Sequence, residues 1–415
     1  MNALELPASD EAIELYQQQR KQIKDQEASF DKREQNKSLA HARMSLVLDL
    51  AQDTALRAVN ANGFNEALVW FWFNHFNVFW QKGLVGVALP DYLNAVIRPH
   101  SQGRFADLLL ATLIHPAMLV YLDNTRNVAG KINENYAREL LELHTLGVNG
   151  GYSQNDVKEV AKVLTGVGLK PLKAPKIKPQ FAPLVRASGQ FFFNPQKHEQ
   201  GAKQVVGQVI SGQGFAEIET LITLLSKHPA TAQHICTQLA VFLLGDAPAE
   251  KVINEASQVF KRTEGDLGKV SAFLATQIPS QSGQTFKDPY RYVISAVRLL
   301  SAGVPLKQAR PLVRWLKALG QPLFGRHTPD GYSLYGRDWQ NAGQLTQRFQ
   351  LAPEMVAVVP HLTTEKVSAD RVFEQASTQQ LLARLSANSQ ATLAQAHDAK
   401  ERLALLLASP EFMVW

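Results

Sequence analysis

Apolar residues recur at helical spacing along most of this chain of 415 residues, and the chain shows little of the strict alternation that marks strands. The pattern predicts helices over residues 64–79, 91–96, 105–122, 133–146, 153–164, 218–227, 230–244, 249–262 and 290–302. A repeated period of 3.6 cannot be satisfied in a sheet. We therefore expect an all-α, multi-helix globular protein with long irregular loops and at most a minor strand element.

Composition divides the chain into four segments. Residues 1–60 are rich in Glu, Gln, Lys and Arg and predict a charged N-terminal helical arm. Residues 61–166 predict a helical core that carries most of the motifs described below. Pro, Lys, Gln and Phe dominate residues 167–210, an irregular loop segment in which Phe191–Phe193 suits a strand or an extended stretch. Residues 211–415 predict a C-terminal helical region packed on the core.

Charge and motif content argue against several classes of protein. The formal net charge is +6, but Lys and Arg are dispersed rather than clustered, so we expect no specific nucleic-acid partner. A single cysteine, Cys236, excludes an intrachain disulfide and a multi-cysteine zinc site and is most simply a core residue. The chain contains no Gly-x-Ser-x-Gly, phosphate-binding loop or dinucleotide fingerprint.

The distribution of apolar residues bears on membrane insertion and on the cellular compartment. The most apolar run, residues 67–80, is too short to cross a bilayer, so we expect no transmembrane segment. Residues 1–7 contain no basic stretch followed by an apolar one, which predicts no secretory signal. As written, the chain is expected in the cytoplasm.

The run from Asn133 to Gly147 is the densest in groups that can do chemistry. On a helical wheel Glu134, Arg138 and Glu142 share one stripe with Glu139 beside it, and the apolar residues fall opposite. Pairs spaced i,i+4 stabilise a solvated helix by roughly 0.2–0.5 kcal/mol each. The stripe is therefore either an exposed ion-pair ladder or a site in which Arg138, Glu139 and Glu142 act on a substrate.

Histidines near this run suggest a second kind of site. His144 falls on the apolar side of its helix, where a histidine is either a satisfied core residue or a ligand. His75 lies among aromatic residues, and His115 precedes a proline that breaks a helix ending near Asp123. Because helical metal sites combine His and carboxylate ligands from facing helices, His75, His115 and Asp123 are candidate ligands for a divalent metal. The spacing matches no established metal motif.

Two further clusters are candidates for substrate binding. Arg98, His100 and Arg104 surround a glycine turn and suit an anionic group, although both arginines could instead pair with the acidic helix. His198 follows the Phe191–Phe193 run on a segment that either closes over a pocket or forms an exposed turn.

The chain also resembles one bacterial family in the order and spacing of its motifs. These are Trp72-Phe73-Asn74-His75-Phe76, Arg98 to Phe105, His115 to Asn124, Asn133 to Val148 and Gly151 to Gly166, followed by later landmarks such as Pro329-Asp330-Gly331-Tyr332. The family is catalogued as domain of unknown function 1800, and the resemblance covers most of the chain.

This resemblance implies a mostly helical bacterial protein without an established activity, often encoded beside a sulfatase-like partner. The usual opening segment of the family, an Arg-containing Phe-Gly-Pro motif, is missing here, so a truncated N-terminus would make the protein periplasmic or exported instead. In family members the residue after the equivalent of His198 is usually Asp, whereas this chain has Glu199.

Two functional hypotheses follow. In the first, the protein is a metal-assisted or acid/base hydrolytic enzyme whose polar pocket between helices contains the residues above together with Glu134. Glu139 or Glu142 would be a ligand or general base, and Arg98, Arg104 or Arg138 would hold an anionic group. In the second, the protein is a non-catalytic accessory or scaffold protein, in which the same residues form a buried network and the charged arm binds a partner.

Overall fold

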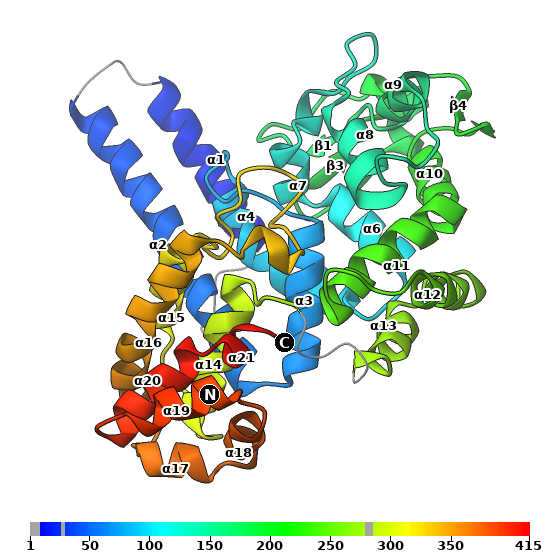
Figure 1. Ribbon diagram of the computed structural model, residues 1–415. Helices are drawn as coiled ribbons and strands as arrows, with labels where there is room; N and C mark the ends of the chain where they lie inside the picture. Colours follow the sequence, from blue (N-terminus) through cyan, green and yellow to red (C-terminus); the bar gives the residue numbers. More distant parts are fainter. Residues whose placement is uncertain (1–8, 26–29, 279–284) are drawn as a thin grey trace.

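The computed structural model describes residues 9–25, 30–278 and 285–415 and is almost entirely helical (Figure 1). Only a few short antiparallel strands interrupt the helices. The predicted all-α class with a minor strand element is confirmed. Residues 1–7, which carry the expectation about secretion, lie outside the described residues.

The N-terminal segment forms a helical hairpin of α1 (Ser9–Asp25) and α2 (Phe30–Asn60). One end of the hairpin projects from the molecule (Figure 1). The other end is not an arm, because Val47, Leu50 and Ala55 are buried in the core. The second half of α2 therefore packs as a core helix through its apolar face.

The central helices follow, and proline sets one of their boundaries. They are α3 (Gly63–His75), α4 (Val85–Asp91), the π-helix η1 (Tyr92–Ile97), α5 (Arg98–His100), α6 (Phe105–Ile114) and α7 (Pro116–Tyr121). The expected helix over residues 105–122 is broken at His115, which is extended because a proline follows it. The expected helix over residues 64–79 ends at His75, which frees Asn77 to bind backbone elsewhere.

The motif-rich run begins after the short 3₁₀ helix η2 (Asn124–Arg126). It forms α8 (Asn135–Glu139), which continues directly into the π-helix η3 (Leu140–Thr145). The next helix, α9 (Gln154–Val163), begins with a capping box, in which Ser153 and Asp156 each bond to the other's backbone N–H.

The middle segment contains the strands. Phe191–Phe193 (β3) is the central strand of a three-stranded antiparallel sheet between β1 (Val167–Leu169) and β2 (Arg186–Ser188). A separate hairpin pairs β4 (Lys203–Val205) with β5 (Gln208–Ile210). The 3₁₀ helices η4 (Pro179–Leu184) and η5 (Pro195–Lys197) complete the segment.

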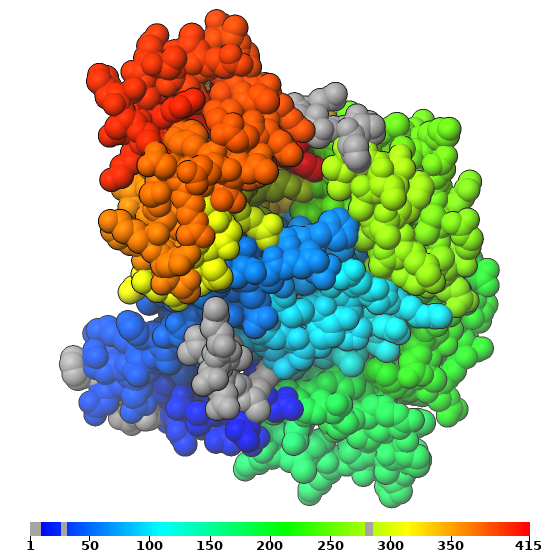
Figure 2. Space-filling model, turned by 90° about the horizontal axis from the view of Figure 1, so that it is seen from below, coloured from blue at the N-terminus to red at the C-terminus, as the bar shows by residue number. Residues whose placement is uncertain are grey.

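The rest of the chain is helical. In order it forms α10 (Ala216–Lys227), α11 (Pro229–Leu244), α12 (Glu250–Arg262), α13 (Leu267–Ala275), α14 (Pro289–Ser301), α15 (Arg310–Ala318), the 3₁₀ helix η7 (Gly336–Asp338), α16 (Ala342–Leu362), α17 (Ala369–Glu374), α18 (Ala376–Ala383), α19 (Ala387–Ala394), α20 (Ala399–Ala408) and α21 (Pro410–Met413). In Figure 2 the last of these helices, orange to red, and the N-terminal hairpin, dark blue, lie at opposite ends of one side.

One apolar cluster connects the whole molecule. Its buried members run from Ile13 to Met413 and include large side chains such as Trp72 and Trp315. Burial of apolar surface on this scale is the main force that holds the helices together. Members come from each of the four segments defined by composition, and that division itself stays a prediction.

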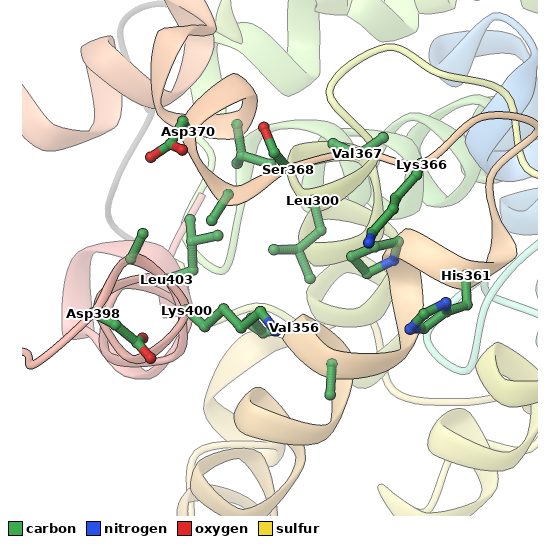
Figure 3. Close-up of a pocket in the computed structure, with 15 residues that line it drawn as sticks. Leu300, Val356, His361, Lys366, Val367, Ser368, Asp370, Asp398, Lys400 and Leu403 are labelled. Carbon is green, nitrogen blue, oxygen red and sulfur yellow. The ribbon is translucent and has the colours of Figure 1, made fainter.

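Two further features of the described residues bear on function. A cavity of about 570 Å³ lies between α14, α16, α17 and α20 (Figure 3). Within residues 9–25, 30–278 and 285–415, no helix is long and apolar enough to cross a membrane.

Candidate functional site

The densest polar run does not form a regular α-helix. Its second half is the π-helix η3, in which the N–H of Leu146 bonds to the carbonyl of Leu141 and the N–H of Gly147 also reaches that carbonyl at 3.2 Å. The wider turn rotates residues after Leu140 relative to an α-helix. The expected i,i+4 ladder therefore stops halfway, and Arg138 binds Glu134 at 3.2 Å and Gln154 at 2.9 Å rather than Glu142.

Glu139 lies at the junction of α8 and η3 and is half-buried. Burial raises the pKa of its carboxyl, and the neighbouring charges of Glu142 and Asp330 raise it further against the opposing effect of Arg138. Among the described residues, no hydrogen bond reaches the Glu139 carboxyl. We call Glu139, Glu142 and Asp330 the carboxylate cluster.

Asp330 comes from a segment almost two hundred residues later, and two asparagines at the end of α3 hold that segment in place. Asn74 accepts from the N–H of Tyr332 at 2.7 Å and donates to its carbonyl at 2.8 Å. Asn77 donates to the carbonyls of Arg326 and Thr328 at 3.1 and 2.8 Å. These bonds satisfy buried amides that sequence alone showed only as polar groups among aromatic residues.

A glycine makes this close approach possible. Gly331 has φ +71°, and a Cβ there would stand 2.2 Å from the carbonyl oxygen of Asn74. Asp330 itself accepts hydrogen bonds from Arg326, at 3.0 Å, and from Thr328. The Asp330 carboxylate is therefore bound by residues of its own segment.

Two tyrosines border the carboxylate cluster. The Tyr121 hydroxyl donates to the carbonyl of His327 at 2.7 Å, and burial together with the charges of Asp330 and Glu139 raises its pKa. The Tyr152 hydroxyl donates to Glu142 at 3.4 Å. Both phenols stay protonated near neutral pH, and Tyr152 donates its proton to a carboxylate whereas Tyr121 donates its proton to backbone.

Three histidines occupy the opposite, buried side of η3. The ring of His75 lies 6.1 Å from that of His144 and 6.2 Å from that of His234, measured between centroids. Nε2 of His75 is 3.3 Å from the carbonyl oxygen of His144, and Nε2 of His234 is 3.1 Å from that of Leu143. A carbonyl only accepts, so both rings carry their proton on Nε2 and cap the last carbonyls of the helix.

His144 differs from its two neighbours. The side chain is 1% exposed, and within the described part of the chain neither ring nitrogen has a hydrogen-bond partner. Burial lowers the pKa of His144 to about 3, with a smaller contribution from His234, and burial also lowers the pKa of His75 well below its ordinary value. His144 is therefore a core residue, as one of the two interpretations had it, but its ring nitrogens are not hydrogen-bonded as that interpretation expected.

The candidate metal ligands are not brought together. His115 accepts from the N–H of Ala117 through Nδ1 and donates through Nε2 to Asp91 at 3.0 Å, which makes it the cap of α7. Asp123 pairs with Lys82 at 2.7 Å, and His75 binds backbone as described above. In the part of the chain that the structure describes, no group of three or more His, Cys, Asp or Glu side chains is arranged to hold a metal ion.

The candidate substrate-binding arginines also lie elsewhere. Arg98 pairs with Glu66 at 2.5 Å and Arg104 with Glu264 at 2.9 Å, so neither meets the acidic face of α8. Nδ1 of His100 is 2.7 Å from the carbonyl oxygen of Val96 within the same helical turn. Each of the three side chains is therefore paired with a group on its own or a neighbouring helix or turn.

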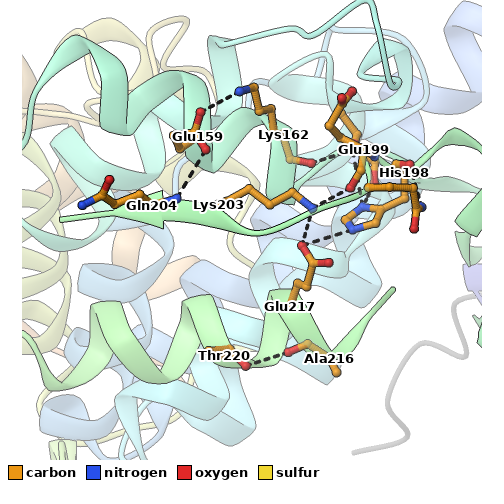
Figure 4. Close-up of polar contacts among 11 residues, drawn as sticks. Glu159, Lys162, His198, Glu199, Lys203, Gln204, Ala216, Glu217 and Thr220 are labelled. Carbon is orange, nitrogen blue, oxygen red and sulfur yellow. Dashed lines mark hydrogen bonds and ion pairs between the residues drawn. The ribbon is translucent and has the colours of Figure 1, made fainter. Parts of the chain in front are cut away.

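His198 belongs to a buried ion network rather than to a closing loop (Figure 4). Its Nε2 lies 3.3 Å from an Oε2 of Glu217 that also accepts from Lys203 Nζ at 2.5 Å, and all three side chains are at most 2% exposed. Lys203 donates as well to the carbonyl of Glu199. The network ties β4 to α10, so the expectations of a lid and of an exposed turn are both wrong.

Arg138, Glu139, Glu142 and His144 thus lie on consecutive turns of α8 and η3, with His144 on the buried side, and the structure adds residues that sequence reasoning missed. The added residues are Tyr121, Tyr152, His234 and Asp330. Asp330 lies in the landmark Pro329-Asp330-Gly331-Tyr332, where an acidic residue beside a turn glycine was the available signal. Nothing local marks His234, which lies in the middle of an apolar helix.

A family model described as "Protein of unknown function (DUF1800)" matches residues 2–414, nearly the whole chain. The chain belongs to the DUF1800 family. The resemblance inferred from the motif order is therefore confirmed. No curated protein and no solved structure matches this DUF1800 protein.

The buried histidines predict an acid-sensitive fold. In the unfolded chain His144 titrates near its ordinary value of about 6.5, whereas in the folded chain its pKa is about 3. Below about pH 6.5 the unfolded state therefore binds more protons than the folded state. As the pH falls through this range, each such histidine lowers the unfolding free energy by about 1.4 kcal/mol per pH unit. Urea denaturation between pH 7.5 and 5 should show this slope. His144→Leu should reduce this slope by the equivalent of about one bound proton. His41→Leu, at an exposed site, should leave the slope unchanged.

The ion network of Figure 4 predicts a large difference between breaking a buried pair and replacing it. Lys203→Met leaves Glu217 charged and buried, which should lower the unfolding free energy by about 3–5 kcal/mol. The double variant Lys203→Met/Glu217→Leu should recover most of that loss. Urea denaturation measures both. The control is Lys227→Met at the exposed Lys227–Glu264 pair, which should cost less than about 1 kcal/mol. Equal losses in the single and double variants would contradict this account.

Proposed function

We propose that this DUF1800 protein is a hydrolytic enzyme that works by acid–base catalysis, with Glu139 as the group that transfers the proton. The observation that carries the proposal is the state of that side chain. Glu139 is half-buried, is without a hydrogen bond among the described residues, and has a raised pKa beside two further carboxylates. Structural carboxylates are normally hydrogen-bonded or ion-paired, whereas a raised pKa in such a cluster is typical of a proton donor.

The neighbours of Glu139 suit defined roles. In its protonated form Glu139 would give its proton to the leaving group, while an ionised Glu142 would take a proton from the attacking water. Water would thus be divided between the two products, and the carboxyls would return to their starting states by exchanging one proton. Tyr152, which already donates to Glu142, would orient that base.

The enclosing elements favour a fixed geometry. Asn74 and Asn77 hold the segment that carries Asp330 through four bonds to the backbone of Arg326, Thr328 and Tyr332. Tyr121 binds the same segment through the carbonyl of His327. Catalytic groups need supporting hydrogen bonds that set their orientation before substrate binds. Arg138 lies beside Glu139 and would attract an anionic substrate group, although its present partners are Glu134 and Gln154.

The Glu139→Gln variant tests this assignment in two ways. Hydrolysis of chromogenic esters, phosphoesters and glycosides should fall about 10²–10⁴-fold for whichever substrate the wild type turns over. The unfolding free energy should stay the same or rise slightly, because the variant removes a charge that its surroundings disfavour. Turnover is followed by absorbance and stability by urea denaturation.

The matched control is Glu219→Gln at an exposed position on α10, which should change neither quantity. Carbon-13 NMR titration should also place the Glu139 pKa above that of an ordinary carboxyl, and Glu142→Gln should lower it. An ordinary pKa at Glu139, or wild-type turnover in Glu139→Gln, would contradict the proposal. A large loss of stability without loss of turnover would favour a scaffold role.

A second function is favoured by the surface of the N-terminal hairpin. Leu15, Met44 and Leu48 are among the few large apolar residues that are exposed, and all three lie on α1 or α2. A groove of about 270 Å³ between the two helices is lined by Leu15, Leu39 and Leu46. Exposed apolar surface of this kind suits a protein partner, and the family resemblance suggests a sulfatase-like one.

Leu15→Ser tests this second function. The substitution removes an exposed apolar side chain at the groove and should leave the unfolding free energy within about 0.5 kcal/mol of wild type. Co-purification of the wild-type protein with a co-expressed sulfatase-like partner is expected, and Leu15→Ser should lose it. Unchanged co-purification in Leu15→Ser would exclude the groove as the contact, and Gln18→Ser, one turn further along α1, serves as the control.

A further inference from the structure

The cavity between α14, α16, α17 and α20 lies far from the carboxylate cluster (Figures 1 and 3). Its walls include buried apolar side chains from all four helices and the connecting loop, namely Leu300, Val356, Val367, Val372 and Leu403. At about 570 Å³ it is in the range of cavities that bind small molecules, and such sites combine apolar walls with a few polar groups. Nothing in the acid–base proposal uses this cavity.

The polar groups of the cavity are predominantly cationic on one side. Lys366, from the loop before α17, and Lys400, from the first turn of α20, extend toward each other across the face of α16 (Figure 3). Neither ammonium group has a hydrogen-bond or ion-pair partner among the described residues, and the same is true of the His361 ring beside them. Unpaired cations over an apolar wall leave a place for a negative charge.

The two carboxylates of the cavity do not neutralise these lysines. Asp370 and Asp398 lie at the opposite end of the cavity from Lys366 (Figure 3). Asp398 is already engaged, since it accepts from the N–H of Glu401 at 2.8 Å as the cap of α20. Lys366 and His361 therefore make one end of the cavity cationic, whereas Lys400 extends toward that end from α20, which also carries Asp398 (Figure 3).

We propose that this cavity binds a small amphipathic anion. Its carboxylate or phosphate head would lie between Lys366 and Lys400, and its aliphatic chain would cover Leu300, Val356 and Leu403. A lysine ammonium group acts as a point charge, so it binds a carboxylate and a phosphate alike. The ligand class is therefore defined by an acidic head group joined to an aliphatic chain. Burial of the chain would contribute about 0.8 kcal/mol per methylene, which makes chain length a determinant of affinity.

Isothermal titration calorimetry with decanoate and with decyl phosphate, below their micelle concentrations, tests the proposal and separates the two head groups. Saturable binding at one site is expected for at least one of them. Affinity should fall roughly tenfold in Lys366→Gln/Lys400→Gln, since each exposed charge contributes several-fold. The matched control is Lys158→Gln/Lys317→Gln, which removes two exposed lysines outside the cavity and should leave affinity unchanged.

Two further arms keep the result interpretable. Ala357→Trp places a bulky ring at an exposed position that lines the cavity and should abolish binding while the fold stays intact by circular dichroism. Inorganic phosphate and acetate, which lack a chain, should bind far more weakly. Equal binding of decyltrimethylammonium, unchanged affinity in the lysine variant, or no binding of either decyl anion at millimolar concentration would overturn the proposal.

Discussion

The wide turn of η3 is the constraint on which the rest of this site depends. A π-helix leaves its last carbonyls without their usual partners, and in this protein imidazoles satisfy two of them. His75 reaches from α3 and His234 from α11, so that two helices distant in sequence are fixed to one turn. The buried His144 ring between them is excluded from this pairing and has no partner of its own among the described residues.

The same turn sets what lies on its outer side. Because the helix widens after Leu140, Glu142 leaves the stripe that Glu134 and Arg138 share, and the ion-pair ladder is cut short. Glu139 lies at the junction of the two helical types, where burial raises the pKa of its carboxyl and the charges of Glu142 and Asp330 raise it further against the effect of Arg138.

Sequence reasoning worked best where the determinants are local. The helix after Ser153 and the burial of Cys236 depend on neighbouring residues or on composition, and both were predicted. The grouping of Arg138, Glu139, Glu142 and His144 also followed from one short run. Reasoning failed for Arg98, Arg104 and His198, because polar residues that look alike in sequence are distinguished only by whichever partner a neighbouring element brings to them.

By itself, the sequence determined a mostly helical protein of the DUF1800 family, since apolar periodicity and motif order are properties of the chain that need no tertiary contacts. Only the tertiary structure decided which polar groups meet. Asn74 and Asn77 bind a segment about 250 residues away and bring Asp330 to Glu139, and His234 reaches the end of η3 from another helix. Such contacts arise from the packing of apolar faces, which places side chains together without leaving any spacing in the sequence to mark them.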